Sequence, residues 1–510
     1  MRSAAVKLAT LLVGLHAGSC ALMMGYGDHV EEEPIQSSST GGSGGSAGHG
    51  GGAGHGGGGA PTGFVADWSY RGGDGDIQSF NAVALAGSGD VLLAGSYQGS
   101  IDLFGEAFSS PDGLDLVAAR LTPAGAAVWT KGKLDEPPSG SKLLRVASDI
   151  VADASGNVIL TGGLTSAGGA IDGFLVGLDG GTGNELWLVS YDGGGTDATG
   201  RLALDSSSRI RLFAESKDKG FTFGSAVITP AGPPSRDLAL ATCTNTTCST
   251  STVKLFGGPG DDTGAAIAAD VLPGGAVFVT GNYEGSWSGL ADAGASTGVF
   301  VNKHDADGDV IWTRGFVQKQ PSSCPYTLLD RPAARALATR SDGDVVATGV
   351  MCGDTSFGLD ESDADVVLEG RGAADVFVVR LSGQSGKVVW ARVFGDAVSQ
   401  MGSAVAVGAN DAVYLTGLFA GTLDLGPGQT HVGSPSTQRL FLAELSGASG
   451  DCVRSAAFGD GEPAAQQRLV LGARPGALVL AGTWTTALDF GAGALAPHGG
   501  LDAFVVSFSP

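Results

Sequence analysis

The chain repeats one sequence pattern between Trp68 and Pro510, and this repetition limits the possible folds more than any other feature. Each copy has a turn, usually containing glycine, followed by an apolar run that usually ends in Ala-Gly or Thr-Gly. The runs cover residues 91–95, 158–162, 209–214, 277–281, 345–349, 412–417 and 477–482, the third being degenerate. Their mean spacing from Gly95 to Gly482 is 64.5 residues, and we count seven repeats.

The apolar runs predict strands that are buried on both faces. They are continuous and rich in β-branched residues, as in Val158, Ile159 and Leu160, instead of alternating with polar residues. Sheets that stack face to face around an axis bury both faces of their strands, whereas a two-layered sandwich leaves one face of each sheet in water. The pattern therefore favours an all-β ring of sheets.

Each repeat contains enough material for four strands. A strand that begins with Asp recurs at 172–176, 375–381 and 502–506. Another strand carries a tryptophan at position 129, 187, 312 or 390. A short apolar stretch before each turn, such as 149–152, supplies one more. Four strands make one blade, so the sequence predicts a seven-bladed β-propeller of four-stranded antiparallel blades.

The two ends of the repeat region predict how the ring closes. The region begins at Trp68 with the sequence of a fourth strand and ends at 504–508 with that of a third strand. The N-terminal strand can therefore complete the last blade and leave no open sheet edge. We expect Trp68 to lie close to Phe504.

The segment 253–262, continuing through 266–270 to 279–281, resembles the bacterial seven-bladed propeller repeat known as SBBP. Similar aromatic-Gly-Asp sequences occur at 394–396 and 458–460. The resemblance covers essentially Trp68 to Pro510, with an insertion around 318–332 in the fifth repeat. It implies a propeller fold and export, and the family brings no shared catalytic residues.

The N-terminus predicts export and lipid attachment. Arg2 and Lys7 precede an apolar run at 8–15 that is too short to span a bilayer. The following Ala17-Gly18-Ser19-Cys20 resembles a bacterial lipobox, although Ala17 stands where leucine is usual. The resemblance implies that Cys20 is acylated and that the protein is a cell-envelope lipoprotein, in the outer membrane and facing the periplasm or the cell surface. The alternative is an ordinary secretory signal in which Cys20 is incidental.

We interpret residues 1–19 as the signal peptide, 20–63 as the lipidated cysteine and a tether, and 64–510 as the propeller. The tether is dominated by Gly, Ser, Ala and His and has no apolar surface to offset the entropy of ordering, so we expect it to be flexible.

The formal charge of −23 excludes nucleic acid as an expected partner. An acidic chain favours cationic partners such as Ca²⁺, but acidity more often serves solubility. We expect a monomer.

Five cysteines besides Cys20 suit an oxidising compartment. Cys243 and Cys248 flank a short turn between two expected strands, so a disulfide that clamps a hairpin is predicted. Cys324 lies in the fifth-repeat insertion and pairs with Cys352 in our interpretation. Cys452, in the tryptophan-bearing strand of its repeat, is interpreted as a buried free thiol. The clustered Cys/His spacing of a zinc site is absent from the sequence.

Asp305, Asp307 and Asp309 are weak calcium candidates, because three carboxylates in five residues can converge on one cation. Glycine stands fourth in this segment, whereas an EF-hand loop has it sixth. The corresponding turns of other repeats lack the acids. A solvated hairpin turn is the favoured interpretation, with no metal and no other cofactor.

No segment predicts a catalytic site. The Gly-x-Ser-x-Gly sequence at 294–298 is followed by an expected strand, where a nucleophile elbow requires a helix. His304, His431 and His498 lie in different repeats and are interpreted as surface or turn residues. The segments 178–187 and 385–390 resemble the tryptophan-docking motif of quinoprotein dehydrogenase propellers, where that motif joins blades and performs no chemistry.

Two functions remain open at this point. The first and favoured one is a binding or scaffold module without catalytic activity, presenting loops and an axial end to a protein or polysaccharide ligand. The second is an envelope enzyme, carbohydrate-active or quinone-dependent, whose site is assembled on the axial face from scattered loops.

Overall fold

The computed structural model describes residues 63–133, 144–165, 171–192, 200–217, 220–223, 226–228, 236–243, 248, 251–258, 260–285, 287, 297–318, 333–357, 366–462 and 468–510. One compact unit comprises Gly63–Pro510. The predicted signal peptide, Cys20, the tether and Cys324 lie outside the described residues.

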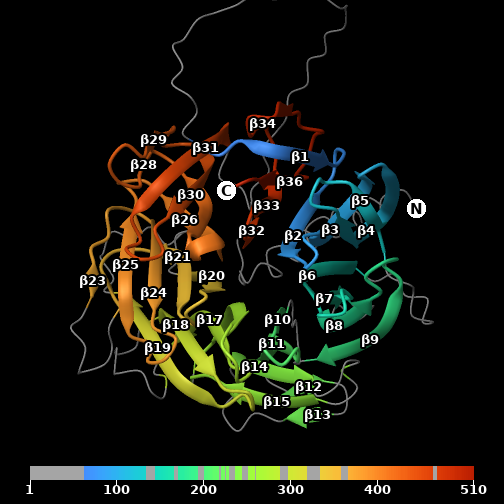
Figure 1. Cartoon of the computed structure of the whole chain (residues 1–510), viewed down its shortest axis with the longest axis horizontal. Coiled ribbons are helices and arrows are strands. Elements are labelled where there is room, and N and C mark those ends of the chain that lie inside the picture. Colours follow the sequence, from blue (N-terminus) through green and yellow to red (C-terminus); the bar gives the residue numbers. More distant parts are fainter. Residues whose placement is uncertain are drawn as a thin grey trace, which may run out of the picture. The chain divides into compact units, whose positions relative to one another are not determined.

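The described strands form a propeller of seven antiparallel blades around a common axis (Figure 1). The first blade is β2 (Gln78–Leu85), β3 (Val91–Leu103), β4 (Glu106–Leu121) and β5 (Ala127–Lys131). The second is β6 (Leu144–Ala152), β7 (Val158–Thr165), β8 (Ile171–Leu178) and β9 (Glu185–Asp192), extended by β12 (Phe221–Phe223) and β13 (Ala226–Ile228). The third is β10 (Arg201–Leu204), β11 (Ile210–Lys217), β14 (Arg236–Cys243) and β15 (Ser251–Phe256).

The remaining blades repeat the same order. The fourth is β16 (Thr263–Ala269), β17 (Val277–Glu284), β18 (Thr297–His304) and β19 (Val310–Gln318), extended by β22 (Thr355–Ser356) and β23 (Val367–Leu368). The fifth is β20 (Ala333–Thr339), β21 (Val345–Met351), β24 (Asp375–Leu381) and β25 (Val388–Phe394). The sixth is β26 (Gln400–Val407), β27 (Val413–Phe419), β30 (Gln438–Leu445) and β31 (Cys452–Glu462). The seventh is β32 (Leu469–Arg474), β33 (Ala477–Trp484), β36 (Asp502–Phe508) and β1 (Ala66–Gly72).

Three small elements lie outside the blade sheets. The hairpins are β28 (Thr422–Asp424) with β29 (Thr430–Val432), and β34 (Leu488–Asp489) with β35 (Ala494–Leu495). The 3₁₀ helix η1 (Ala409–Asp411) sits in the turn before β27. Among the described residues, no helix has the length and apolar character needed to span a bilayer.

The strand from the N-terminal end closes the ring, as the sequence predicts. β1 pairs antiparallel with β36, placing Trp68 opposite Ser507 and Arg71 opposite Phe504. Arg71 Nε also lies 3.0 Å from Asp502 Oδ2, and both side chains are buried. The last blade is therefore built from both ends of the propeller, which leaves this sheet no missing strand.

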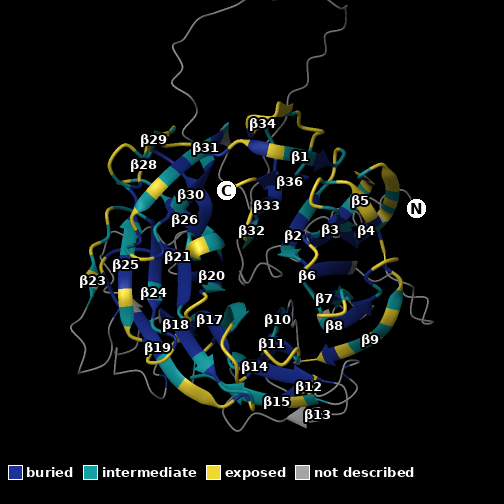
Figure 2. Cartoon of the chain, viewed as in Figure 1, coloured by how far each residue is buried: buried dark blue, intermediate teal, exposed yellow. Residues whose placement is uncertain are grey.

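The blades bury both faces of their middle strands (Figure 2). Every residue of β21 is buried, as is every residue of β27 and of β36. Large apolar clusters join neighbouring blades: one cluster includes Leu92 of the first blade and Leu160 of the second. This packing between sheets explains the continuous apolar runs in the sequence.

Tryptophans on the outer strands dock four of the described blades (the first, fourth, fifth and seventh) onto the next one. Trp129 Nε1 donates to the carbonyl of Gly180, at 3.0 Å, in the turn between the third and fourth strands of the next blade. The indole of Trp129 also lies against Gly183, which has φ 69°. Equivalent bonds join Trp68 to Pro123, Trp312 to Gly383 and Trp390 to Gly447. The docking role predicted for this motif is confirmed within the described blades.

We expect Gly183→Ala to lower the free energy of unfolding by about 1–3 kcal/mol. A Cβ at Gly183 would lie 2.8 Å from Trp129 Cδ2, and its positive φ disfavours any side chain. Gly181→Ala in the same turn is the matched control, because the nearest atom to its Cβ would be Asp179 Oδ1 at 3.6 Å. Urea denaturation of the two variants checks this, and equal stabilities would contradict the docking role of Gly183.

Candidate ligand-binding site at the propeller axis

The first strands of the blades surround the axis of the ring. They are β2, β6, β10, β16, β20, β26 and β32, and each contacts the first strand of the neighbouring blade, including β32 with β2 (Figure 1). The described first strands and the residue before β32 carry several charged side chains: Arg145 and Asp149 on β6, Arg201 on β10, Arg335 on β20, Arg468 immediately before β32 and Arg474 at the end of β32. We call Arg201, Arg335 and Arg468 the axial arginine cluster. Its members belong to the third, fifth and seventh blades.

Bulges in the first strands direct side chains along the inner ring. In β20 the pairing register shifts between Ala334 and Ala336, so Arg335 is the extra residue of a β-bulge. The same shift in β2 and β6 leaves Asn81 and Ser148 as the extra residues. Both of these reach the next blade: Asn81 donates to Ala147 O and Ser148 donates to Gly200 O, each at 2.9 Å.

Arg201 is fixed between the blades on either side of its own. Its Nε donates to Ala265 O and its Nη1 donates to Ser148 O, both at 3.1 Å. Asp149 is held by backbone amides, because Oδ2 accepts from Leu202 N at 2.8 Å and Oδ1 from Ile150 N at 2.9 Å. These bonds fix where the two charges lie.

The guanidinium of Arg468 lacks such hydrogen bonds. Its backbone N–H donates to Thr483 Oγ1 at 3.1 Å, but its guanidinium makes no hydrogen bond or ion pair with any described residue. The side chains of Arg468, Arg335, Arg201 and Asp149 are all partly exposed. The Arg468 guanidinium is therefore a cation without a carboxylate partner among the described residues.

The surroundings of the cluster disfavour the charged form of Arg335 and Arg468. Burial, together with the charges of Arg201 and Arg335, lowers the pKa of Arg468 to about 9, whereas Asp149 acts in the opposite direction. Burial also lowers the pKa of Arg335 to about 10. Burial raises the pKa of Asp149, against the attraction of Arg201 and Arg468. Arg468 is thus coupled electrostatically to the other three groups, and both arginines stay charged at neutral pH.

The predicted calcium candidates sit in the turn between β18 and β19. Asp305 Oδ1 accepts the backbone N–H of Asp307 and of Asp309, both at 2.9 Å. Asp309 Oδ1 is 2.6 Å from Lys254 Nζ in the preceding blade, and Asp307 is exposed. Within the described part of the chain, no group of three or more His, Cys, Asp or Glu side chains is placed to hold a metal. This geometry supports the hairpin-turn interpretation, and calcium binding stays a prediction.

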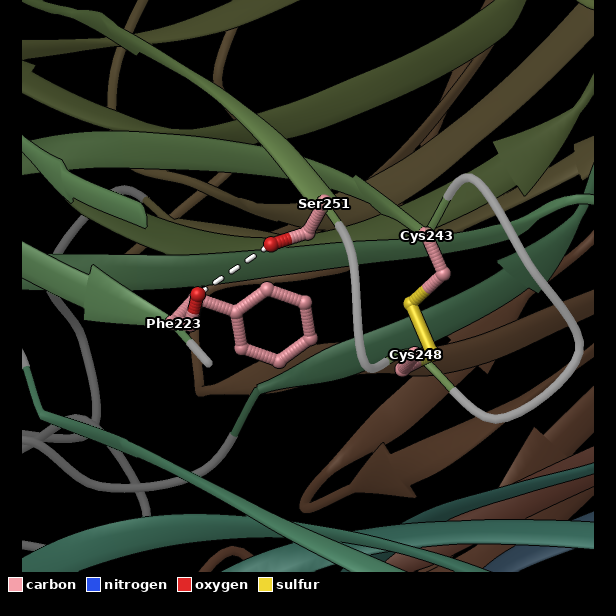
Figure 3. The surroundings of a disulfide bond; sticks show 4 residues. All are labelled: Phe223, Cys243, Cys248 and Ser251. Carbon is pink, nitrogen blue, oxygen red and sulfur yellow. Dashed lines mark hydrogen bonds between the residues drawn. A yellow bond between two sulfur atoms is a disulfide. The ribbon is translucent and has the colours of Figure 1, made fainter. Parts of the chain in front are cut away.

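The cysteine predictions are partly tested. Cys243 and Cys248 form a disulfide with a Cα–Cα distance of 4.7 Å, which closes the turn between β14 and β15 (Figure 3). Beside it, Ser251 Oγ donates to Phe223 O at 3.1 Å (Figure 3). Cys352 is buried and disulfide-bonded, but its proposed partner Cys324 lies outside the described residues. Cys452 is a free thiol, as predicted, but it is half-buried and not buried.

The histidine prediction is wrong for His304, which is completely buried. Its ring lies 4.6 Å from that of Phe256, and burial lowers its pKa to about 4. The apolar neighbours come from the preceding blade, which the local sequence does not reveal.

A serine–histidine contact occurs in the sixth blade. His431 Nε2 lies 2.7 Å from Ser455 Oγ, and Ser455 Oγ donates to Gln429 Oε1 at 2.7 Å. The single hydroxyl proton is directed at Gln429, so the imidazole nitrogen donates to the hydroxyl and does not accept its proton. A general base that activates a serine needs the opposite direction.

The sequence reasoning missed the axial arginine cluster. Its members are single departures from the repeat: the bulge position holds Asn81 and Ser148 in other blades and Arg335 only in the fifth. Aligning the seven first strands, and searching for charged residues at positions where the other repeats have none, would have found it.

No family model matches the chain, and no curated protein matches it. Solved structures with a similar fold include a quinohemoprotein alcohol dehydrogenase from Comamonas testosteroni, with 11% identity, a TM-score of 0.43 and coverage of 87% of this chain and 76% of that one. The polysaccharide lyase Uly1 shows 10% identity, a TM-score of 0.42 and coverage of 84% and 90%. A europium-containing methanol dehydrogenase shows 10% identity, a TM-score of 0.40 and coverage of 87% and 93%. At such identities the likeness concerns the fold alone.

Proposed function

We propose that this protein is an SBBP-like lipoprotein of the bacterial cell envelope, whose propeller is a binding or scaffold module without catalytic activity. The observation that carries this is the character of the axial site. The inner ring contributes arginine side chains such as Arg201, Arg335 and Arg468, and guanidinium groups bind and orient anions but do not exchange protons near neutral pH. The carboxylate beside them, Asp149, has both oxygens occupied by backbone amides.

The proposed location rests on the N-terminal sequence. The lipobox ending in Cys20 would supply a lipid anchor, and residues 20–63 would form a tether between the membrane and the propeller. In this proposal the protein is a monomer in the outer membrane, faces the periplasm or the cell surface, and takes a protein or polysaccharide ligand.

Replacing Cys20 by alanine is expected to release a folded protein from the membrane. Without the acylated cysteine the chain keeps no lipid, and its acidic surface gives no attraction to anionic membranes. Expression in a bacterial host, fractionation and immunoblotting measure the distribution between membrane and soluble envelope fractions. Cys452→Ala is the matched control and is expected to stay in the membrane fraction. Membrane retention of the Cys20→Ala protein would refute the lipid anchor.

The absence of catalysis has its own test. A polysaccharide that binds the propeller is expected to be recovered unchanged, with no new reducing ends and no unsaturated products. Turnover that disappears when an axial arginine is replaced would overturn the proposal and favour an enzyme with a site at the axis.

A further inference from the structure

Two junctions between blades each contain a buried aspartate beside a buried glutamine. At the ring closure, Asp502 is the first residue of β36 and lies beside Gln78, the first residue of β2. Between the fifth and sixth blades, Asp375 is the first residue of β24 and lies beside Gln400, the first residue of β26. All four side chains are completely buried.

The backbone around the two pairs is equivalent. The glutamine N–H donates to the carbonyl of the residue before the aspartate, to Leu501 O at 2.7 Å in the closure and to Ala374 O at 2.8 Å in the other junction. The N–H four residues before each aspartate donates to its Oδ2, from His498 at 2.7 Å and from Arg371 at 2.6 Å. The two junctions can therefore be compared position by position.

The junctions differ in how the charge of the carboxylate is balanced. At the closure, Arg71 supplies a cation, with Nε 3.0 Å from Asp502 Oδ2. The pairing of β1 with β36 and of β25 with β24 puts Val393 at the position of Arg71. Asp375 thus has the setting of Asp502 without that guanidinium. Burying an ionised carboxylate without a close cation is costly, so this position favours the neutral acid.

The amide oxygen of Gln400 faces an oxygen of Asp375. A Cβ at Gly395 would lie 1.9 Å from Asp375 Oδ1 and 2.7 Å from Gln400 Oε1, so both oxygens border the same point. The orientation of the amide is fixed, because Nε2 donates to Asp396 Oδ1 at 2.6 Å and to Ala420 O at 2.9 Å. Within the described residues, Asp375 Oδ1 has no hydrogen-bond partner. Two acceptor oxygens in this arrangement repel each other unless one of them carries a proton.

We propose that this junction is a proton latch: Asp375 holds a proton that it donates to Gln400 Oε1, and the contact between the fifth and sixth blades loosens when the proton leaves to solvent. The bond would use the second lone pair of Gln400 Oε1, because the first accepts from Asp396 N at 3.1 Å. The inference goes beyond the proposed function, since it requires neither a lipid anchor nor a ligand.

The electrostatic surroundings support a protonated Asp375. Burial raises its pKa to about 6, against hydrogen bonds from the backbone of Arg371 and Gly372. Of the charged groups that act on it, Arg371 lowers the pKa and Asp396 raises it. The residue opposite Asp375 on β21 is the uncharged Met351. The stabilising contribution of the proton is fully present below the ordinary pKa of about 4 and is lost as the pH rises through about 6.

Hydrogen exchange of the purified full-length chain, followed by mass spectrometry, tests the latch. The N–H of Gln400 reports on the junction between the fifth and sixth blades, and the N–H of Gln78 reports on the closure, where Arg71 balances the carboxylate. After correction for intrinsic exchange, the ratio of the Gln400 to the Gln78 protection factor should fall roughly tenfold between about pH 5 and 8. Using the ratio removes pH effects that act on the whole propeller.

Three variants identify the titrating group. Asp375→Asn should abolish the pH dependence of the ratio, because an amide has no such proton to lose. Val393→Arg should reduce it, because the substitution supplies the cation that Arg71 provides at the closure. Asp451→Asn is the matched control: Asp451 is exposed and pairs with Arg392 at 2.9 Å, so the pH dependence should stay unchanged. A ratio that is independent of pH in the wild type, or that changes equally in Asp375→Asn, would overturn the proposal.

Infrared spectroscopy detects the proton itself. The difference spectrum between the wild type and Asp375→Asn at about pH 5 should contain the C=O band of a protonated carboxylic acid, and at about pH 8 it should contain carboxylate bands instead. Carboxylate bands at both pH values would show that Asp375 is ionised throughout, which would also overturn the proposal.

Discussion

Arg71→Met is expected to lower the free energy of unfolding by about 3–5 kcal/mol, the usual effect of removing one partner from a buried ion pair. Arg71 lies on β1 and pairs at 3.0 Å with Asp502 on β36, where both side chains are buried. Its guanidinium also donates to the carbonyls of Trp484 and Thr486. The substitution leaves the Asp502 carboxylate without its cation at the junction that closes the ring.

Chemical denaturation of the wild type, Arg71→Met, Asp502→Asn and the double variant measures the coupling between the two groups. The double variant should be more stable than the Arg71→Met protein, because it carries no unpaired buried charge. Arg392→Gln, which breaks an exposed pair, should change stability by less than about 1 kcal/mol. Equal effects of Arg71→Met and Arg392→Gln would mean that the closure does not depend on this pair.

The second large effect expected is a pH-dependent gain in stability on replacing Asp262 by asparagine. Asp262 is completely buried at the start of the fourth blade. Burial, with smaller contributions from the charges of Asp237 and Asp261, raises its pKa to about 7 against hydrogen bonds from the backbone of Gly258 and Glu284. The folded protein therefore holds a proton on Asp262 at a pH at which the unfolded chain has lost it.

The sign of the effect follows from this proton. The contribution of Asp262 to stability is fully present below its ordinary pKa of about 4 and is lost as the pH rises through about 7. The asparagine side chain of the variant has no such proton to lose. At about pH 8 the Asp262→Asn protein should be more stable than the wild type by roughly 2–4 kcal/mol, and near pH 5 the difference should shrink to about 1 kcal/mol.

Urea denaturation of both proteins from about pH 5 to 8 checks this expectation. The comparison must be between variant and wild type, because buried His304 has the opposite sign: its pKa is lowered to about 4, so its contribution is lost as the pH falls. Burial raises the pKa of Asp375 to about 6, so Asp375 also makes stability depend on pH. This contribution is the same in the wild type and in the Asp262→Asn protein, and it cancels in the comparison. A stability difference that does not change with pH would show that Asp262 is ionised in the folded protein.

Much of the fold could be predicted because a propeller repeats its local chemistry. Each blade needs strands buried on both faces, and this requirement appears directly as a run such as Val345 to Gly349. Docking of Trp129 on the next blade needs a glycine of positive φ at Gly183, and that pairing also repeats. Closure could be predicted from the phase of the repeat, since the first strand lacks predecessors and the last lacks a successor.

The candidate site could not be predicted in this way. Asp149, Arg201, Arg335 and Arg468 are spread over more than half of the chain, and each looks like an isolated substitution within its own repeat. Likewise, His304 gives no local sign of burial, because Phe256 packs against it from another blade.

The sequence by itself determined the blades, their number and their order, and it alone supports the proposed signal, Cys20 anchor and tether. These follow from local patterns: strand periodicity, turn residues and the composition of short segments. Only the tertiary structure decided which charges meet, from Arg71 with Asp502 at the closure to the arginines at the axis. Electrostatic and hydrogen-bonding interactions depend on distance in space, and bending seven sheets into a ring brings together residues that the linear chain keeps apart.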